Sequence, residues 1–282
     1  MNKTKIEWVK NSDGTWGYTW NPITGCLNHI NGMCKGGNFP CYAYRLAHGR
    51  LKKRYLANGN IAPVPYAITM DEVSKHLADP FYPREWFNRR EPLLESRKPK
   101  GVFACDMSDL FGIGIPDSWI EGVLETIKVC PEHRFYLLTK QPQNLPKWFP
   151  NRDDGGHSNC WVGSTITNDG MMDATVKAFD GLWSPVRFIS FEPLLGRLSK
   201  GSLKQIRDCI CQWVIIGQKT PVSARTQPKV EWIQEIVEAA DKAGIPVFLK
   251  DNLRPLISKL SATEALPFYD SQTCELRQEF PK

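Results

Sequence analysis

The sequence contains no apolar run long enough to cross a membrane, which argues against a helical membrane protein. Residues 1–5 are basic but no apolar segment follows them, so we expect no secretory signal. The nine cysteines are an odd number and are spread unevenly, which argues against a disulfide framework and favours reduced thiols. We therefore expect a cytoplasmic protein with no membrane partner.

Other familiar signatures are missing as well. No G-x-G-x-x-G follows a β-prone run, which counts against a dinucleotide-binding fold. The five histidines form no acid–base or metal-binding motif. The composition, 41% hydrophobic and 23% charged over 282 residues, is ordinary for a globular protein and suits one large domain. The net charge of +6 is compatible with an anionic partner without requiring one.

The most informative segment is residues 20–44, which holds three cysteines in one turn-rich loop. A loop interrupted so often can fold back and direct three thiolates at one centre. Three thiolates leave one position open on a metal ion or an iron–sulfur cluster, and an open position is typical of a working site. Sulfur ligands favour zinc or iron–sulfur clusters over hard cations. The cysteines are Cys26, Cys34 and Cys41, and the turn residues are Pro22, Gly25, Gly32, Gly36, Gly37 and Pro40.

Structural zinc is the main alternative for this loop. His29 could complete a Cys3His set with the three cysteines, and zinc prefers such tetrahedral sets. However, the spacings are not the usual paired C-x2–4-C, and a domain of this size needs no metal staple. We favour an iron–sulfur cluster and leave zinc open. The six other cysteines are expected to be small apolar residues, the first being nearest the predicted pocket: Cys105, Cys130, Cys160, Cys209, Cys211 and Cys274.

Six short β-prone runs follow residue 100 at spacings of roughly one βα unit. Helical patterns lie between most of them, most clearly over residues 117–129 and 231–243. Strands alternating with helices predict a parallel sheet, and a further short strand over residues 17–21 precedes the cysteine loop. The predicted fold class is α/β, a partial parallel (β/α) barrel of about six or seven units. The runs begin near residues 101, 134, 159, 186, 212 and 246.

The same pattern sets the expected domain boundaries. Residues 1–253 form the predicted barrel domain, with the cysteine loop at residues 20–44 and a helix beginning at Tyr42. Residues 57–100 are rich in proline and are interpreted as an insertion, with short helices expected over residues 71–78 and 84–88. The periodicity fades after residue 253, so residues 254–282 are expected to form a C-terminal cover or a weakly ordered tail.

A polar or charged residue follows each β-prone run. In α/β barrels the active site lies at the carboxyl ends of the strands, so we expect these side chains to line a pocket that faces the cysteine loop. The alternative is that strand ends are polar simply because they are solvated. This explains a single polar residue well but explains less well a polar residue after every run. Glu192, within Phe-Glu-Pro, either caps a strand or faces the pocket, and we favour the pocket. The residues are Asp106, Asp109, Thr139, Lys140, Ser164, Thr165, Glu192, Gln218, Lys219, Lys250 and Asp251.

Several segments occur in an order that resembles a known family. It is the phage-associated three-cysteine-motif family, which is in turn similar to radical S-adenosylmethionine (SAM) enzymes, including the spore-photoproduct-lyase-like branch. The resemblance covers roughly residues 5–253. The segments are WNPITGC at residues 20–26, CYA at 41–43, MSDLF at 107–111, LTK at 138–140, WVGS at 161–164, FEPLL at 191–195 and FLK at 248–250.

The resemblance implies a radical-SAM-like partial barrel that holds a [4Fe–4S] cluster on Cys26, Cys34 and Cys41. SAM would bind the fourth iron, and an electron donor would drive its cleavage to a 5′-deoxyadenosyl radical. The reaction that this radical serves is not implied. By analogy of position, the expected cofactor-binding residues are Asp106, Lys140, Ser164, Glu192 and Gln218, and the candidates for a catalytic role are Cys105 and Glu192.

The chain departs from the radical-SAM pattern at two points. The common spacing is C-x3-C-x2-C, whereas here seven residues separate Cys26 from Cys34 and six separate Cys34 from Cys41. The second gap, residues 35–40, is interpreted as an insertion. Gln218 stands where many relatives have a glutamate.

Two basic stretches, residues 45–54 and 84–100, suggest an anionic macromolecule as a partner. A solvated helix face is the simpler interpretation of such charge. A nucleic acid that is modified or repaired would reconcile the basic stretches with radical chemistry, while a peptide or a small molecule stays open as the substrate. The alternative function is a zinc- or cluster-bearing nucleic-acid-binding protein without radical catalysis.

Overall fold

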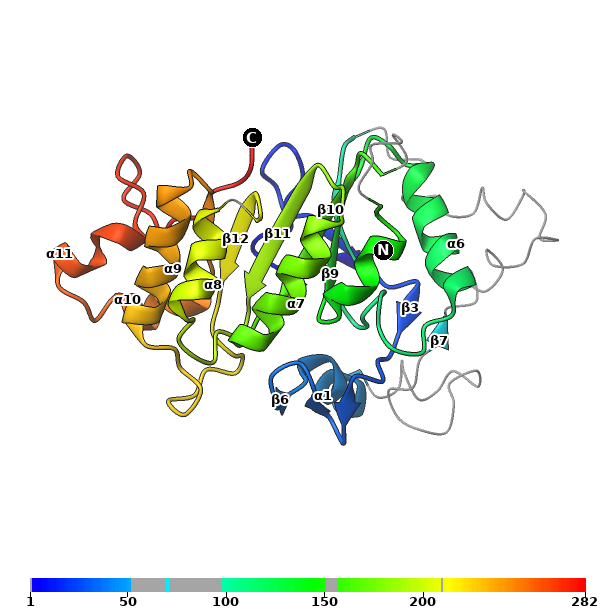
Figure 1. Cartoon of the computed structure of the whole chain (residues 1–282), viewed down its shortest axis with the longest axis horizontal. Coiled ribbons are helices and arrows are strands. Elements are labelled where there is room, and N and C mark those ends of the chain that lie inside the picture. The colour runs from blue at the N-terminus through cyan, green and yellow to red at the C-terminus, as the bar shows by residue number, and fades with distance from the viewer. Residues whose placement is uncertain (1, 52–68, 71–97, 151–156, 209) are drawn as a thin grey trace.

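The computed structural model describes residues 2–51, 69–70, 98–150, 157–208 and 210–282 (Figure 1). Its centre is an eight-stranded sheet in which strand neighbours follow chain order. Seven strands are parallel, and the short edge strand β1 (Asn2–Lys3) is antiparallel to its neighbour. The parallel strands are β2 (Tyr18–Trp20), β8 (Gly101–Ala104), β9 (Arg134–Thr139), β10 (Cys160–Thr165), β11 (Val186–Phe191), β12 (Trp213–Ile216) and β13 (Val247–Leu249).

Helices connect these strands and cover one face of the sheet (Figure 1). Each helix has an apolar stripe that packs on the strand residues pointing toward it, such as Ile120 and Val123 against Val102 and Phe135. The α/β class and the parallel sheet are therefore confirmed. Among the described residues the two edge strands, β1 and β13, do not pair with each other, so the sheet is open. The helices are α6 (Asp117–Lys128), α7 (Asp169–Asp180), α8 (Lys200–Arg207) and α9 (Val230–Lys242).

The opposite face of the sheet is packed with aromatic rings rather than covered by helices. Residues that alternate with the helix-facing ones point to this side, because successive side chains of a strand lie on opposite faces. Trp8, from the turn that precedes β2, lies against Phe103, with 4.9 Å between ring centroids, and against Trp213 at 6.3 Å. The remaining large residues of this cluster are Tyr136, Trp161, Phe188 and Phe248.

The segment interpreted as an insertion, residues 57–100, lies mostly outside the described residues, and so do both short helices expected within it and Lys52 to Arg54 of the first basic stretch. One described part of it, β7 (Thr69–Met70), pairs antiparallel with β3 (Ile23–Thr24) at the start of the cysteine loop. Among the described helices, none combines the length and apolar content that a membrane span needs.

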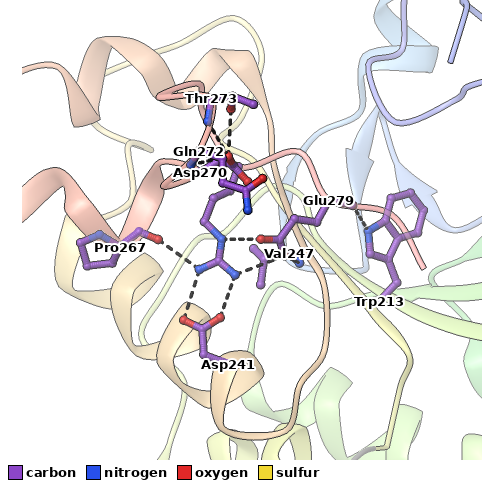
Figure 2. Close-up of polar contacts among 9 residues, drawn as sticks. Trp213, Asp241, Val247, Pro267, Asp270, Gln272, Thr273 and Glu279 are labelled. Atoms are coloured by element: carbon purple, nitrogen blue, oxygen red, sulfur yellow. Dashed lines mark hydrogen bonds and ion pairs between the residues drawn. The ribbon is translucent and has the colours of Figure 1, made fainter. Parts of the chain in front are cut away.

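The C-terminal segment covers the edge of the sheet. After two short helices, α10 (Arg254–Ile257) and α11 (Ala262–Ala265), the chain runs antiparallel to β13: the N–H of Leu249 donates to the carbonyl of Arg277 at 2.8 Å. The Arg277 guanidinium donates to Asp241 on α9 at 2.7 Å and to Glu279 at 2.9 Å (Figure 2). A covered edge cannot pair with another chain, which is one way in which sheet proteins avoid aggregation.

Candidate functional site

A cavity of about 500 Å³ opens at the carboxyl ends of the strands, on the aromatic face of the sheet. The cysteine loop lines one side of it and the strand ends line the other. The predicted meeting of strand ends and cysteines is therefore present in the structure. Of the strand-end residues expected there, Thr139, Ser164 and Asp251 do not line the cavity. The predicted residues that do line it are Cys26, Cys34, Cys41, Cys105, Asp106, Asp109, Lys140, Thr165, Glu192, Gln218, Lys219 and Lys250.

Two tight hairpins give the cysteine loop its shape. Asn31 and Gly32, both with positive φ (47° and 82°), turn the chain between β4 (His29–Ile30) and β5 (Met33–Cys34). Asn-Gly favours this kind of two-residue turn because both residues tolerate positive φ. A second turn leads from β5 to β6 (Phe39–Pro40), so the gap interpreted as an insertion is the second hairpin of a three-stranded sheet. The N–H of Cys41 then donates to the carbonyl of Gly32 at 2.8 Å, which returns the third cysteine to the first hairpin.

The loop is seated directly on the ends of β9 and β10. A Cβ placed on Gly36 would lie 3.1 Å from the Lys140 side chain, which is a tight contact. A Cβ on Gly37, whose φ is 119°, would lie 2.3 Å from the Thr167 hydroxyl, so only glycine fits at residue 37. The Thr167 hydroxyl donates to the carbonyl of Gly36 at 3.3 Å. These contacts hold the second hairpin against the sheet, with Lys140 beside it.

Asn21 ties the start of the loop to the end of β8. Its side-chain carbonyl accepts from the N–H of Met107 at 3.0 Å, and its amide donates to the Asp106 carboxylate. The hydroxyl of Tyr42, the first residue of α1 (Tyr42–His48), donates to the backbone carbonyl of Asp106. The loop and the helix that follows it therefore both converge on Asp106.

The three thiols share one wall of the cavity but do not yet form a ligand set. No three His, Cys, Asp or Glu side chains of the described residues stand close enough together to hold a metal ion as they are. Burial, and to a smaller extent the Asp109 carboxylate, raises the pKa of Cys26 to about 12. Burial also raises the pKa of Cys34, although the neighbouring Lys140 ammonium opposes the shift. Both thiols are therefore neutral at physiological pH, and a metal would have to displace their protons.

His29, the residue that would complete a zinc site, has a role within the hairpin. Its Nδ1 accepts from the N–H of Gly32 at 3.2 Å, and its ring packs edge-on against Tyr44 with 4.9 Å between centroids. Burial lowers the pKa of His29, which keeps the ring neutral and able to accept this bond. These contacts give the histidine a structural explanation that needs no metal.

Asp109 is buried and joins the ends of β8 and β9. Its carboxylate accepts from the Thr139 hydroxyl at 2.6 Å, from the N–H of Lys140 at 2.9 Å and from the N–H of Phe111 at 3.3 Å. Burial raises the pKa of Asp109, and these hydrogen bonds oppose the shift. With its acceptors engaged in this way, Asp109 fixes the shape of the site rather than binding a ligand.

Asp109→Ala is therefore expected to lower the free energy of unfolding by about 3 kcal/mol, because it leaves the buried donors of Thr139 and Lys140 without an acceptor. Urea denaturation followed by circular dichroism measures the change. Asp173→Ala, on the exposed side of α7, is the control and should stay within about 0.5 kcal/mol of the parent protein. Equal effects of the two substitutions would refute this role for Asp109.

Ser164 is the predicted cofactor-binding residue that the structure does not bring to the cavity. Its hydroxyl lies 2.7 Å from the Thr175 hydroxyl on α7, so it faces the helix layer. The next residue, Thr165, points the other way and lines the cavity. The alternation of side chains along a strand explains the difference, and the placement of Ser164 counts against its predicted role.

Glu192 and Lys250 form an ion pair at the ends of β11 and β13. The side chains are 26% and 14% exposed, and a Cβ on Gly217 would lie 2.9 Å from Lys250 Cδ, so the glycine between them makes room for the pair. Burial alone would lower the pKa of Lys250, but the carboxylates of Glu192 and Glu7 outweigh it, and the pKa is raised. The lysine is therefore charged at neutral pH.

Cys105 has an unusual backbone. Its φ of 63° places a non-glycine residue in the left-handed region, where strain is often found at functional sites. Its N–H donates to the carbonyl of Trp20 at 2.7 Å, which joins the ends of β2 and β8. Burial raises the pKa of this thiol to about 12, so it is a neutral S–H group on the cavity wall.

Sequence reasoning missed several lining residues, among them Trp8 and Ser190, which carry buried polar atoms without a partner among the described residues. Trp8 lies in a short N-terminal turn with no periodicity to mark it, and Ser190 lies inside a strand rather than after its end. A strict two-residue alternation counted back from Glu192 would have placed Ser190 on the cavity face, so a signal for it existed. Trp8 offered no such signal.

Comparison with known proteins gives a family without an activity. No curated protein and no solved structure matches this chain. A family model described as "Protein of unknown function (DUF5131)" matches residues 3–258, which include the cysteine loop and all seven parallel strands. This match covers most of the chain. The protein is therefore a member of the DUF5131 family.

Proposed function

We propose that the protein is a radical SAM enzyme that carries a [4Fe–4S] cluster on Cys26, Cys34 and Cys41. The observation that carries the proposal is that three thiols from one loop line the same cavity as polar residues from the ends of the parallel strands. A structural metal site needs no such cavity, whereas an enzyme needs a shielded space beside its metal.

The donor set fits the cluster in its chemistry. Three sulfur ligands suit iron–sulfur clusters, and His29, the nearby fourth ligand for zinc, is engaged in the hairpin. The three thiols would have to turn toward one another and lose their protons as the cluster forms. When bound, the cluster would supply the electron that cleaves SAM to methionine and a 5′-deoxyadenosyl radical.

The residues of the chain would bind and shield the cofactor. Lys140, close to Cys34, offers a cation for the SAM carboxylate, and the carboxylate of Asp106 suits its amino group. The Thr165 hydroxyl is buried, lines the cavity and has no hydrogen-bond partner among the described residues, so a bound polar group could satisfy it. The aromatic rings beneath the cavity exclude water from the radical.

The partial-barrel shape of the sheet is part of the same proposal. Strand order that follows chain order, with helices on one face and aromatic side chains on the other, is how a barrel is built. An open sheet of this kind corresponds to a partial barrel in which the missing strands leave room for a large substrate. We therefore propose a radical-SAM-like partial barrel over residues 1–253.

Reductive cleavage of SAM tests this function. Anaerobically reconstituted protein, incubated with SAM and dithionite, is expected to release 5′-deoxyadenosine and methionine, measured by liquid chromatography with mass spectrometry. Lys140→Ala should weaken SAM binding by about tenfold, the loss of one charged hydrogen bond, while iron content is unchanged.

The matched control is Lys147→Ala, which removes an exposed lysine that pairs with Asp117 on the surface. It should leave SAM affinity and cleavage as they are. Protein that contains the full cluster but neither binds nor cleaves SAM would refute the enzyme and favour a cluster-bearing binding protein.

A further inference from the structure

Three buried polar atoms of cavity-lining residues have no hydrogen-bond partner among the described residues. They are the indole Nε1 of Trp8, the hydroxyl of Ser190 and the side-chain oxygen of Gln218, and all three residues line the cavity. Each residue is no more than 2% exposed. Buried polar groups are nearly always paired in folded proteins, so an unpaired group on a cavity wall marks a place where a ligand supplies the partner.

The donor and acceptor roles of two of these atoms are fixed. An indole N–H can only donate. The side-chain amide N–H of Gln218 donates to the backbone carbonyl of Asn252, and the Asn252 side chain donates to the backbone carbonyl of Gln218 at 2.8 Å. The free end of Gln218 is therefore its oxygen, which can only accept. A ligand that satisfies both atoms must carry an acceptor and an N–H or O–H donor, which excludes an ionised carboxylate and an ammonium ion.

The walls and the mouth of the cavity narrow the chemical class of the ligand further. Trp8 and Phe103 provide aromatic surface beside the unpaired atoms, which suits a flat ring. The described lining residues include five cationic side chains and three carboxylates. Two of the cations are exposed: Arg45 on α1 and Arg50 just after it. A cationic rim over a neutral polar pocket favours a ligand with a neutral heterocycle and an anionic group.

We propose that the part of the cavity lined by Trp8, Ser190 and Gln218 binds the base of a nucleotide, with its phosphate toward Arg45 and Arg50. The proposal rests on the proposed function only in assigning another part of the cavity, beside Cys34 and Lys140, to SAM. It makes a nucleotide, free or within a nucleic acid strand, the substrate class of the enzyme. The N–H and C=O groups of the base would pair with Gln218 and Trp8, and Ser190 would complete the pocket.

Isothermal titration calorimetry of the full-length protein tests the proposal with three probes: uridine 5′-monophosphate, a six-nucleotide single strand, and ribose 5-phosphate. The mononucleotide or the strand should bind, and ribose 5-phosphate should bind at least tenfold more weakly because it lacks the base. Binding of the strand alone identifies a nucleic acid as the source of the nucleotide, and binding of both identifies the free nucleotide as sufficient. Equal binding of ribose 5-phosphate, or no binding of any probe, overturns the proposal.

Ser190→Ala separates a binding role from a structural one. It should weaken nucleotide binding about tenfold, the loss of one hydrogen bond, while the midpoint of thermal unfolding stays the same or rises, because no bond within the protein is broken. Ser184→Ala is the matched control: this hydroxyl lies 2.9 Å from the carbonyls of Cys160 and Val186 at the other end of the sheet. It should lower the midpoint and leave binding unchanged.

Competition with SAM distinguishes this proposal from the proposed function. Nucleotide and SAM should bind together, so SAM should not displace the nucleotide. Displacement would assign this part of the cavity to SAM and overturn the nucleotide site. Failure of SAM cleavage with nucleotide binding intact would instead refute the radical enzyme and leave the nucleotide site standing.

Discussion

Replacement of any one of Cys26, Cys34 and Cys41 by alanine is expected to abolish the iron–sulfur cluster. The three thiols of residues 20–44 are the only protein ligands in the proposal, so losing one leaves two, too few to hold a cubane. The unsubstituted protein, reconstituted anaerobically, should contain roughly four iron and four sulfide per chain. Iron and sulfide assays, with the absorption and electron paramagnetic resonance spectra of the cluster, measure the change.

The control for the cysteine series is Cys274→Ala, since that thiol is exposed and far along the chain from the loop. It should bind as much iron as the parent protein. His29→Ala distinguishes a zinc site from an iron–sulfur cluster. The substitution would remove a ligand of zinc, whereas a cluster on the three cysteines would lose only a contact within the hairpin. Stoichiometric zinc that depends on His29, with no iron uptake on reconstitution, is the result that would establish the alternative.

Lys250→Met is expected to lower the free energy of unfolding by about 3–5 kcal/mol, because it leaves Glu192 without its cation in a largely buried site. Urea denaturation measures the loss. The double substitution Lys250→Met with Glu192→Leu should recover part of it, since the uncompensated charge is then gone. Recovery by the second substitution is the sign of an interaction between the two side chains rather than of a packing defect.

The pH dependence of this loss has a definite sign. Because the pKa of Lys250 is raised in the folded protein, its contribution is fully present below the ordinary lysine pKa of about 10.4 and is lost as the pH rises through the folded pKa. The difference between parent and Lys250→Met should therefore be constant around neutral pH and shrink only at strongly alkaline pH. The control is Lys204→Met, whose pair with Asp208 is exposed and should cost less than about 1 kcal/mol. A loss no larger than that of the control would contradict the importance of the buried pair.

The sequence predicts most of the strands because buried parallel strands are short, continuous apolar runs. Each expected strand start lies within one residue of the observed one, as at β10 and β13. The helices over α6 and α9 were equally visible from their apolar stripes. Residues 71–97, where two short helices were expected, lie outside the described part of the chain, so those predictions are untested.

The site was harder to predict than the sheet, and Ser164 shows why. Two polar residues, Ser164 and Thr165, stand side by side at the end of β10, and a shift of one residue moves a side chain to the other face. Residue type alone does not tell which of the two side chains points into the cavity. Because Trp161 lies on the aromatic face and side chains alternate along the strand, Thr165 lies on that face and Ser164 does not. The Asn31-Gly32 pair is a hairpin signal that the sequence carries, whereas nothing in residues 35–40 marks the second hairpin as strongly.

The two ends of the described chain meet on one side chain. Trp8 near the start and Phe280 near the end both pack on Trp213, with 6.3 Å and 5.1 Å between ring centroids. During synthesis on a ribosome the aromatic floor of the cavity therefore stays incomplete until residue 280 has emerged, long after the cysteine loop has left the exit tunnel. The thiols are made first, and the aromatic floor beneath their cavity is completed last.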